Sequence, residues 1–246
     1  MTYCVGLMLE PGLVMLADTR TNAGMDNIST FGKLHVFHKP GERMISLMTA
    51  GNLAVSQAVV NLVQEGLPEP ESGEKETIYT VPTMFRAAAL VGEAVRHVHK
   101  VHGEAMRKQD VRFDVSVLVG GQLAGRTLRL FNVYAAGNFI EATRDTPFLQ
   151  VGEHKYGKPI LDRAVRPDMA LADGVKLALI SMDSTLRSNL SVGLPLDLLV
   201  FRRYDLTQPA VRRIGEHDPY FQMIRERWSS ALRDAHRAMP SPDWGI

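Results

Sequence analysis

Three residues in the first part of the chain have side chains suited to nucleophilic catalysis: Thr2, Asp18 and Lys33. If Met1 is removed, Thr2 carries a hydroxyl nucleophile and a free α-amine on one residue. The α-amine has a reference pKa of about 8, against about 10.4 for lysine, so it is the easier base at neutral pH. Asp18 could keep a neighbouring ammonium protonated, and Lys33 beside it could lower the pKa of the hydroxyl or relay its proton.

Each of these residues also has a purely structural interpretation. Many proteins begin with Met-Thr, so Thr2 could be a frayed terminus. Asp18 directly follows an apolar run and could be a turn or cap residue, and a lone lysine such as Lys33 is usually exposed to solvent. The rest of the sequence decides between these interpretations.

Length and composition restrict the class of protein. The chain has 246 residues, of which 45% are hydrophobic and 22% charged, with a formal net charge of +1. These values are typical of a soluble globular protein, and we expect a single domain over residues 1–246. The balanced charge argues against a nucleic-acid or membrane-surface partner. A single cysteine, Cys4, excludes an intrachain disulfide and favours a reducing, cytoplasmic location. The sequence has no recognisable targeting segment and no apolar run of membrane-spanning length.

Apolar patterns predict two strand pairs near the start, at 3–9 with 13–17 and at 34–37 with 44–49. Further strands are predicted over 113–119, 127–134, 139–142 and 196–202, and helices over 52–67, 82–102, 156–165, 169–186 and from 218 onward. Thr80 is the predicted cap of the second helix, 68–77 a solvated loop, and Gly120-Gly121 a turn. Because no run of alternating strands and helices occurs, the order predicts an α+β fold: a four-layer αββα sandwich of two antiparallel sheets.

Other polar clusters have weaker functional interpretations. His97, His99 and His102 lie on the second predicted helix, but the carboxylate at helical spacing, Glu93, pairs with His97 alone, so we predict a solvated face and no metal. The arginines after position 211 are offset by acidic residues, which favours a salt-bridged surface or subunit contact over nucleic acid. The sequence has no phosphate loop or dinucleotide fingerprint, so no cofactor is predicted.

Several motifs taken together resemble a known family. Thr2, which losing one residue would expose, is followed by Asp18-Thr19-Arg20-Thr21-Asn22-Ala23-Gly24, then Lys33, then Thr49-Ala50-Gly51. This arrangement resembles the proteasome-type threonine peptidases, which are N-terminal-nucleophile hydrolases. With the later block Phe148-Leu149-Gln150-Val151-Gly152-Glu153, the chain looks most like the Anbu branch, the bacterial proteasome homologues, and the resemblance extends over the whole chain.

The resemblance implies a role for each matching residue. Thr2 would be the nucleophile, with Asp18 and Lys33 completing the catalytic group and Ser191 supporting the Thr2 amine. Gly51 would offer its backbone N–H to the oxyanion. A cleft for an extended peptide would be lined by Thr21, Asn22, Thr49, Gly51 and Leu53. The family also implies a peptide or unfolded-protein substrate and a homo-oligomer, either a ring or an open spiral with contacts from the outer helices; a partner unfoldase is left open.

The sequence departs from the family pattern at three places. Lys33 is one residue closer to Asp18 than in most proteasome subunits, so we expect the strand start to bulge or shift. Glu153 replaces a serine that supports the nucleophile, and the Asp-x-x-Ser element reads Ser188-Asn189-Leu190-Ser191. Two alternatives therefore stay open: hydrolysis of a non-peptide amide, and an assembly or scaffold subunit with a relic catalytic group.

Overall fold

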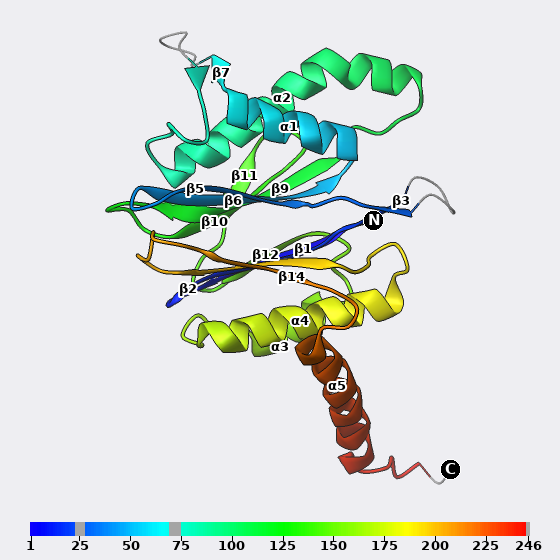
Figure 1. Cartoon of the computed structure of the whole chain (residues 1–246). Helices are drawn as coiled ribbons and strands as arrows, with labels where there is room; N and C mark the ends of the chain where they lie inside the picture. Colours follow the sequence, from blue (N-terminus) through cyan, green and yellow to red (C-terminus); the bar gives the residue numbers. More distant parts are fainter. Residues whose placement is uncertain (23–27, 69–74, 245–246) are drawn as a thin grey trace.

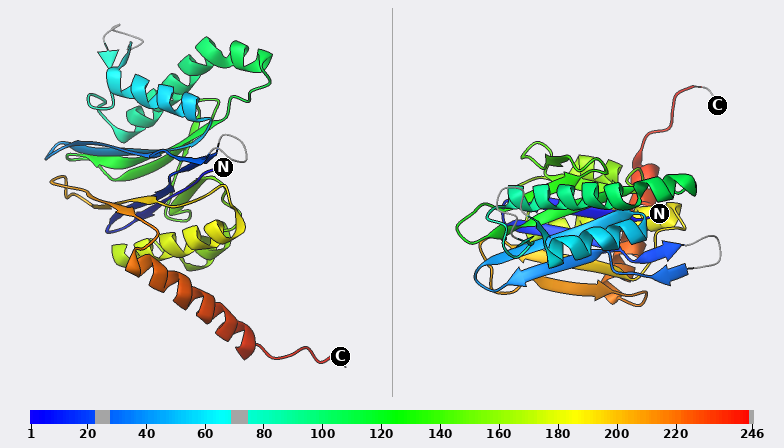
Figure 2. Two further views of the ribbon diagram at one scale, coloured as in Figure 1. Left: turned by 45° about the vertical axis from the view of Figure 1, so that its right-hand side comes forward. Right: turned by 90° about the horizontal axis from the view of Figure 1, so that it is seen from above.

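Two antiparallel five-stranded sheets lie face to face, with helices covering both outer surfaces (Figure 1, Figure 2). The computed structural model describes residues 1–22, 28–68 and 75–244. The first sheet has the order β12 (Phe148–Gly152), β1 (Tyr3–Leu9), β2 (Gly12–Asp18), β13 (Leu196–Arg202), β14 (Ala210–Ile214). The second has the order β11 (Phe139–Glu141), β10 (Arg129–Val133), β9 (Val115–Leu123), β6 (Arg43–Gly51), β5 (Leu34–Lys39). This is the predicted αββα sandwich.

The helices and two short hairpins complete the layers. The second sheet is covered by α1 (Leu53–Glu65) and α2 (Met84–Lys108), and the first by α3 (Lys158–Ala164), α4 (Leu171–Ser188) and the start of α5 (Pro219–Ala238). The hairpins are β3 (Arg20–Asn22) with β4 (Ile28–Thr30), and β7 (Leu67–Pro68) with β8 (Lys75–Glu76).

Burial on both faces explains the continuous apolar run of β2. Val14 and Leu16 pack into the core under the helices, whereas Leu13, Met15 and Ala17 pack between the two sheets. Alternate residues of a strand point to opposite faces, so a strand covered on both sides must be apolar throughout. β2 therefore ends at Asp18 deep inside the molecule, and this places the carboxylate away from solvent.

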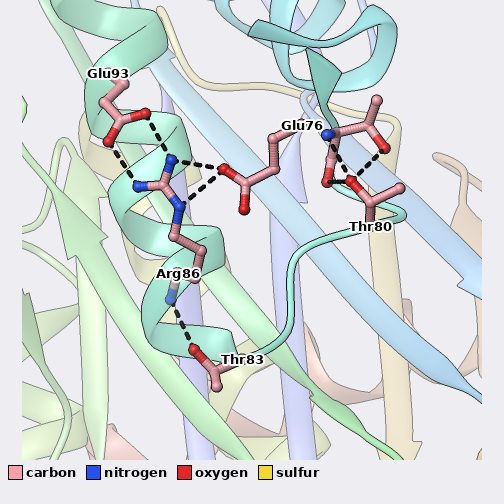
Figure 3. Close-up of polar contacts among 6 residues, drawn as sticks. Glu76, Thr80, Thr83, Arg86 and Glu93 are labelled. Carbon is pink, nitrogen blue, oxygen red and sulfur yellow. Dashed lines mark hydrogen bonds and ion pairs between the residues drawn. The ribbon is translucent and has the colours of Figure 1, made fainter. Parts of the chain in front are cut away.

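The predicted bounds of the two outer helices need correction. α1 begins after Asn52, whose side chain accepts hydrogen bonds from the N–H groups of Ala54 and Val55. Thr83, not Thr80, caps α2, because its hydroxyl accepts the N–H of Arg86 at 3.0 Å (Figure 3). Thr80 instead accepts the N–H of Thr77 in the preceding turn, at 2.9 Å. The helix thus starts later than predicted and continues to Lys108.

The predicted solvated loop at 68–77 is wrong at its last described residues. Glu76 is buried and pairs with Arg86, which also binds Glu93 through both guanidinium nitrogens at 2.6 and 2.9 Å (Figure 3). Glu69, Glu71 and Glu74 lie outside the described residues. The ion pairs tie the β7–β8 hairpin to α2.

The predicted turn at Gly120-Gly121 is also wrong. Both glycines lie within β9, which continues to Leu123. A Cβ at Gly120 would lie 2.8 Å from Leu13 Cδ2 and 3.0 Å from Met15 Sδ, so glycine here permits close packing of the two sheets. Two strands of the five-stranded sheets were not predicted, and neither were the short strands of the two hairpins. β12 is a short edge strand, and β14 is an exposed edge strand whose Arg212 and Arg213 obscure the β pattern.

The last helix begins at the predicted point but packs over only part of its length. Asp218 caps α5 by accepting the N–H of Phe221 at 2.9 Å. Phe221 and Ile224 are buried, whereas Leu232 is 53% exposed. The second half of α5 projects from the body of the molecule (Figure 1, Figure 2). Across the described residues, none of the helices has the length and hydrophobicity of a membrane span.

Candidate active site

A cleft of about 650 Å³ lies where β1, the end of β6 and the start of α1 meet beside the N-terminus. It is lined by Met1, Thr2, Arg20, Thr21, Lys33, Thr49, Ala50, Gly51, Asn52, Leu53, Ala54, Ser56, Asp114 and Gly152. The structure thus brings together, from both sheets, six of the residues predicted from sequence: Thr2, Thr21, Lys33, Thr49, Gly51 and Leu53. Met1 is 65% exposed, whereas Thr2 is 8% exposed.

Thr2 is held in place by the pairing of β1 with β12. The N–H of Glu153 donates to the carbonyl oxygen of Thr2 at 2.7 Å, and Tyr3 lies opposite Gly152. Gly152 has a φ of 82°, and a Cβ there would collide with the Thr2 carbonyl oxygen. Glycine is therefore required for this approach. Thr2 has a defined backbone position and is not a frayed terminus.

Asp18 and Lys33 form a buried ion pair next to this strand. Lys33 Nζ lies 2.7 Å from Asp18 Oδ1, and the side chains are 6% and 0% exposed. Asp18 also accepts the N–H of Tyr3 at 3.0 Å and the N–H of Gly193 at 3.2 Å, and Lys33 donates to the carbonyl oxygen of Arg20 at 2.7 Å. The interpretations as turn residue and exposed lysine are therefore wrong, and the shortened spacing does not prevent the pairing.

Both side chains of the pair are buried, and burial shifts the pKa values of the groups around them. Burial raises the pKa of the Asp18 carboxyl, while the Lys33 ammonium and the N–H groups of Tyr3 and Gly193 act in the opposite direction. Burial likewise raises the pKa of the Cys4 thiol well above its usual range. Cys4 is fully buried and stays a neutral thiol at pH 7, so it is not a competing nucleophile.

Gly51 ends β6 on the side of the cleft opposite Thr2's strand. A Cβ at Gly51 would collide with the carbonyl oxygen of Asp114, because the end of β6 runs close against the chain entering β9. The N–H of Asn52 donates to the same carbonyl oxygen at 2.7 Å, which secures the start of α1. Gly51 is exposed and lines the cleft, while the chain on either side of it is fixed by these contacts with Asp114.

Ser191, the fifth predicted catalytic residue, does not line the cleft. Its N–H donates to Asn189 Oδ1 at 2.9 Å, and Asn189 Nδ2 donates to Glu153 Oε2 at 3.0 Å. Glu153 is buried, with Lys155 Nζ 3.7 Å from its carboxylate. Glu153 thus connects the backbone of Thr2 to the loop after α4, where Ser191 lies.

Sequence reasoning missed several residues of this site. Asp114 reaches the cleft only because β6 pairs with β9, which no local pattern reveals. Ser56 follows Leu53 by one helical turn, a spacing that could have identified it. Arg20 also lines the cleft and donates to the carbonyl oxygen of Leu190 at 2.9 Å. Asn22 lies in β3, but its side chain is outside the described residues.

The histidine cluster gives no metal site. In the described part of the chain, no group of three or more His, Cys, Asp or Glu side chains is placed to hold a metal ion. The ring of His99 packs edge-on against Phe113 with centroids 4.7 Å apart.

The fold and the cleft define a class of protein. An αββα sandwich with Thr2 at the start of β1 beside a buried Asp–Lys pair is the architecture of N-terminal-nucleophile hydrolases. The family model for proteasome subunits matches residues 2–198, and the chain therefore belongs to the proteasome subunit family.

Within that family the similarity is to Anbu. An Anbu (Gly-1) mutant from Hyphomicrobium sp. strain MC1 is 49% identical, covering 99% of this chain and 100% of that one with a TM-score of 0.89. Anbu from Yersinia bercovieri, described as an ancestral β-subunit, is 46% identical with coverages of 99% and 100% and a TM-score of 0.89. A helical assembly of the Anbu complex from Pseudomonas aeruginosa is 48% identical, with 99% of each chain covered and a TM-score of 0.90. No match was found among curated protein sequences.

Proposed function

We propose that this protein is a threonine peptidase that hydrolyses peptide bonds with Thr2 as its N-terminal nucleophile. The observation that carries the proposal is the buried Asp18–Lys33 ion pair, whose lysine lines the same cleft as Thr2. A buried ion pair is costly to form, so an enclosed ammonium beside a hydroxyl is a candidate for tuning that hydroxyl.

The reaction begins with removal of Met1, which is exposed at the mouth of the cleft. The free α-amine of Thr2 then takes the proton of Oγ, and Oγ bonds to the carbonyl carbon of the peptide. Lys33 favours the alkoxide electrostatically, and the N–H of Gly51 donates to the oxyanion. The C–N bond breaks, the proton passes to the leaving amine, and an acyl ester remains on Thr2. A water molecule deprotonated by the α-amine hydrolyses that ester.

Glu153 and Ser191 enter the proposal as positioning residues. Glu153 contacts Thr2 through the backbone, and its carboxylate reaches Ser191 through Asn189. This chain of contacts takes the place of the supporting serine of the family pattern. It supports a fixed orientation of the Thr2 backbone, from which the new α-amine projects.

Shape and lining support an extended peptide as the substrate. The cleft runs between β3, which carries Thr21, and the end of β6, which carries Thr49 and Gly51. Backbone groups at two such strand ends can bind a peptide as an added strand. A panel of peptides and small non-peptide amides tests the alternative substrate class. Hydrolysis of the small amides without hydrolysis of the peptides would favour that alternative.

The decisive experiment is labelling with an electrophilic peptide probe, followed by peptide mapping. We expect one adduct on Thr2 in protein whose intact mass lacks Met1, and no adduct in Thr2→Ala. Light scattering of Thr2→Ala should match the wild type. Labelling at another residue, or full activity with Met1 retained, would contradict the mechanism. No labelling of the wild-type protein that lacks Met1 would favour the scaffold alternative.

Self-assembly is the second part of the proposal. The Pseudomonas aeruginosa relative is described as a helical assembly. In the present chain the second half of α5 projects from the body and carries Leu232 exposed (Figure 2). We infer that copies of this chain assemble through their outer helices into a ring or open spiral, in the reducing cytoplasm that a single cysteine favours.

A further inference from the structure

A second hollow adjoins the cleft, between the first turns of α1 and the last turns of α2. This α1–α2 groove has a volume of about 370 Å³. Its walls include Val55 and Ala58 from α1, Val98, Ala105 and Met106 from α2, and Val111 from the turn after α2. None of these residues has a role in the chemistry described above.

The groove and the cleft meet at the start of α1, where Asn52 and Ala54 line both hollows. The colours of Figure 1 place the start of α1 and the end of α2 on the same side of the molecule as the N-terminus. A peptide that binds across Gly51 and extends along the start of α1 would reach the groove.

The two hollows use different faces of α1. Leu53 and Ser56 face the cleft, whereas Val55 and Ala58 face α2 and line the groove. Side chains of an extended peptide alternate in direction and advance about 3.3 Å per residue. A side chain that enters the groove must therefore belong to a residue at a set distance along the peptide from the bond that is cleaved.

The lining selects the chemistry of that side chain. Val55 and Val98 are 3% and 2% exposed and form an apolar floor, and the flexible thioether of Met106 can adjust to different shapes. His102 and Gln109 lie exposed at the rim. Ligand pockets typically span about 300–1,000 Å³, so the groove is large enough for one bulky side chain and too small for a folded partner.

We propose that the α1–α2 groove is a second specificity subsite, which accepts a large aliphatic or aromatic side chain of the peptide substrate. The proposal rests on the proposed function, since it requires a peptide in the cleft. It predicts that the rate of attack by Thr2 depends on a residue away from the scissile bond.

The test uses peptide probes that carry one electrophile and differ at a single position. Leucine, phenylalanine, alanine or aspartate is placed in turn at each of the positions preceding the electrophile, and the rate of Thr2 labelling is followed by intact mass. We expect one position, other than the one next to the electrophile, to favour leucine or phenylalanine over alanine by about tenfold or more.

A matched pair of variants assigns that preference to the groove. Ala105→Trp fills the groove from an exposed position on α2, whereas Val101→Trp adds the same side chain one turn away, at a residue that does not line it. We expect Ala105→Trp to reduce the preference to less than about twofold, because the indole occupies the space that the leucine or phenylalanine side chain would take. Val101→Trp should keep the preference.

The outcomes separate the two proposals. Labelling without any distal preference, or a preference that survives Ala105→Trp, overturns the subsite alone. A fall in assembly mass in Ala105→Trp by light scattering shows that the groove is a contact with a second copy and also overturns it. Absence of labelling by every probe overturns the proposed function, and the subsite with it.

Discussion

At the scale of single residues, Asp18 connects separate parts of the site. Its carboxylate accepts hydrogen bonds from Lys33, Tyr3 and Gly193, which come from three distant parts of the chain. One residue therefore joins the Lys33 ammonium, the backbone of Tyr3 next to Thr2, and the loop before β13. Its loss should affect stability and reactivity together.

Asp18→Asn tests this at the residue scale. Removing one partner of a buried pair leaves an uncompensated charge, so we expect the free energy of unfolding in urea to fall by about 3–5 kcal/mol. Thr2 labelling should fall by about 100-fold or more, because Lys33 loses its orientation.

Asp162→Asn is the matched control. Its pair with Lys158 is also short, 2.6 Å, but both side chains are about half exposed. Exposed pairs contribute about 0–1 kcal/mol, so this variant should label at the wild-type rate. Equal losses of unfolding free energy in the two variants would show that the burial of Asp18 does not determine the effect of its removal on stability.

At the scale of elements, β12 positions Thr2, the proposed nucleophile, although it is only five residues long. Its last residue, Gly152, packs against the carbonyl of Thr2, and the next N–H along the chain donates to that carbonyl. Among the described strands, β12 pairs with β1 alone and forms an edge of its sheet. A change at its end is therefore transmitted directly to Thr2.

Gly152→Ala should displace the start of β1. The left-handed φ costs a non-glycine residue about 1–2 kcal/mol, and the collision with Thr2 adds about 1–3 kcal/mol more. We expect the free energy of unfolding in urea to fall by the sum of these two costs, and we expect Thr2 labelling to be lost. Gly125→Ala is the control, since it has a φ of 67° but open space around a Cβ. Gly125→Ala should lose only the stability that the left-handed φ costs, and its Thr2 should label at the wild-type rate. Loss of labelling in Gly125→Ala as well would refute the claim that Gly152 acts by positioning Thr2.

At the scale of the whole molecule, α5 is the element least supported by its own chain. Phe221, Ile224 and Trp228 pack against the body of the molecule, whereas Leu232 further along is 53% exposed. Most of the stability of a helix in a protein comes from tertiary packing of its apolar face. A neighbouring copy of the chain would provide that packing.

Leu232→Glu tests this contact, because a buried charge at a subunit interface is costly. We expect light scattering at micromolar concentration to show a clear shift toward the monomer mass. Ser230→Glu adds the same charge on the opposite side of the helix and should leave the mass unchanged. An unaltered mass in Leu232→Glu would exclude this face as a contact.

Much of the fold could be predicted because local sequence patterns identify most of its helices and strands. The run from Leu13 to Ala17 is apolar at every position, which requires cover on both faces, and helical spacing identifies α2, α4 and α5. The prediction failed where context outweighs pattern. Gly120 permits sheet packing instead of a turn, Arg213 lies in an edge strand, and Thr83 caps a helix that Thr80 was expected to begin.

The sequence by itself determined the local elements and brought forward Thr2, Asp18, Lys33 and Gly51 as candidates, since residue types and their order along the chain are local properties. Only the tertiary structure decided that Asp18 and Lys33 pair out of solvent, that Gly193 and Glu153 reach the same site, and that Ser191 stands outside the cleft. The physical reason is that these contacts depend on strand register and on how closely the layers approach, which many residues set jointly.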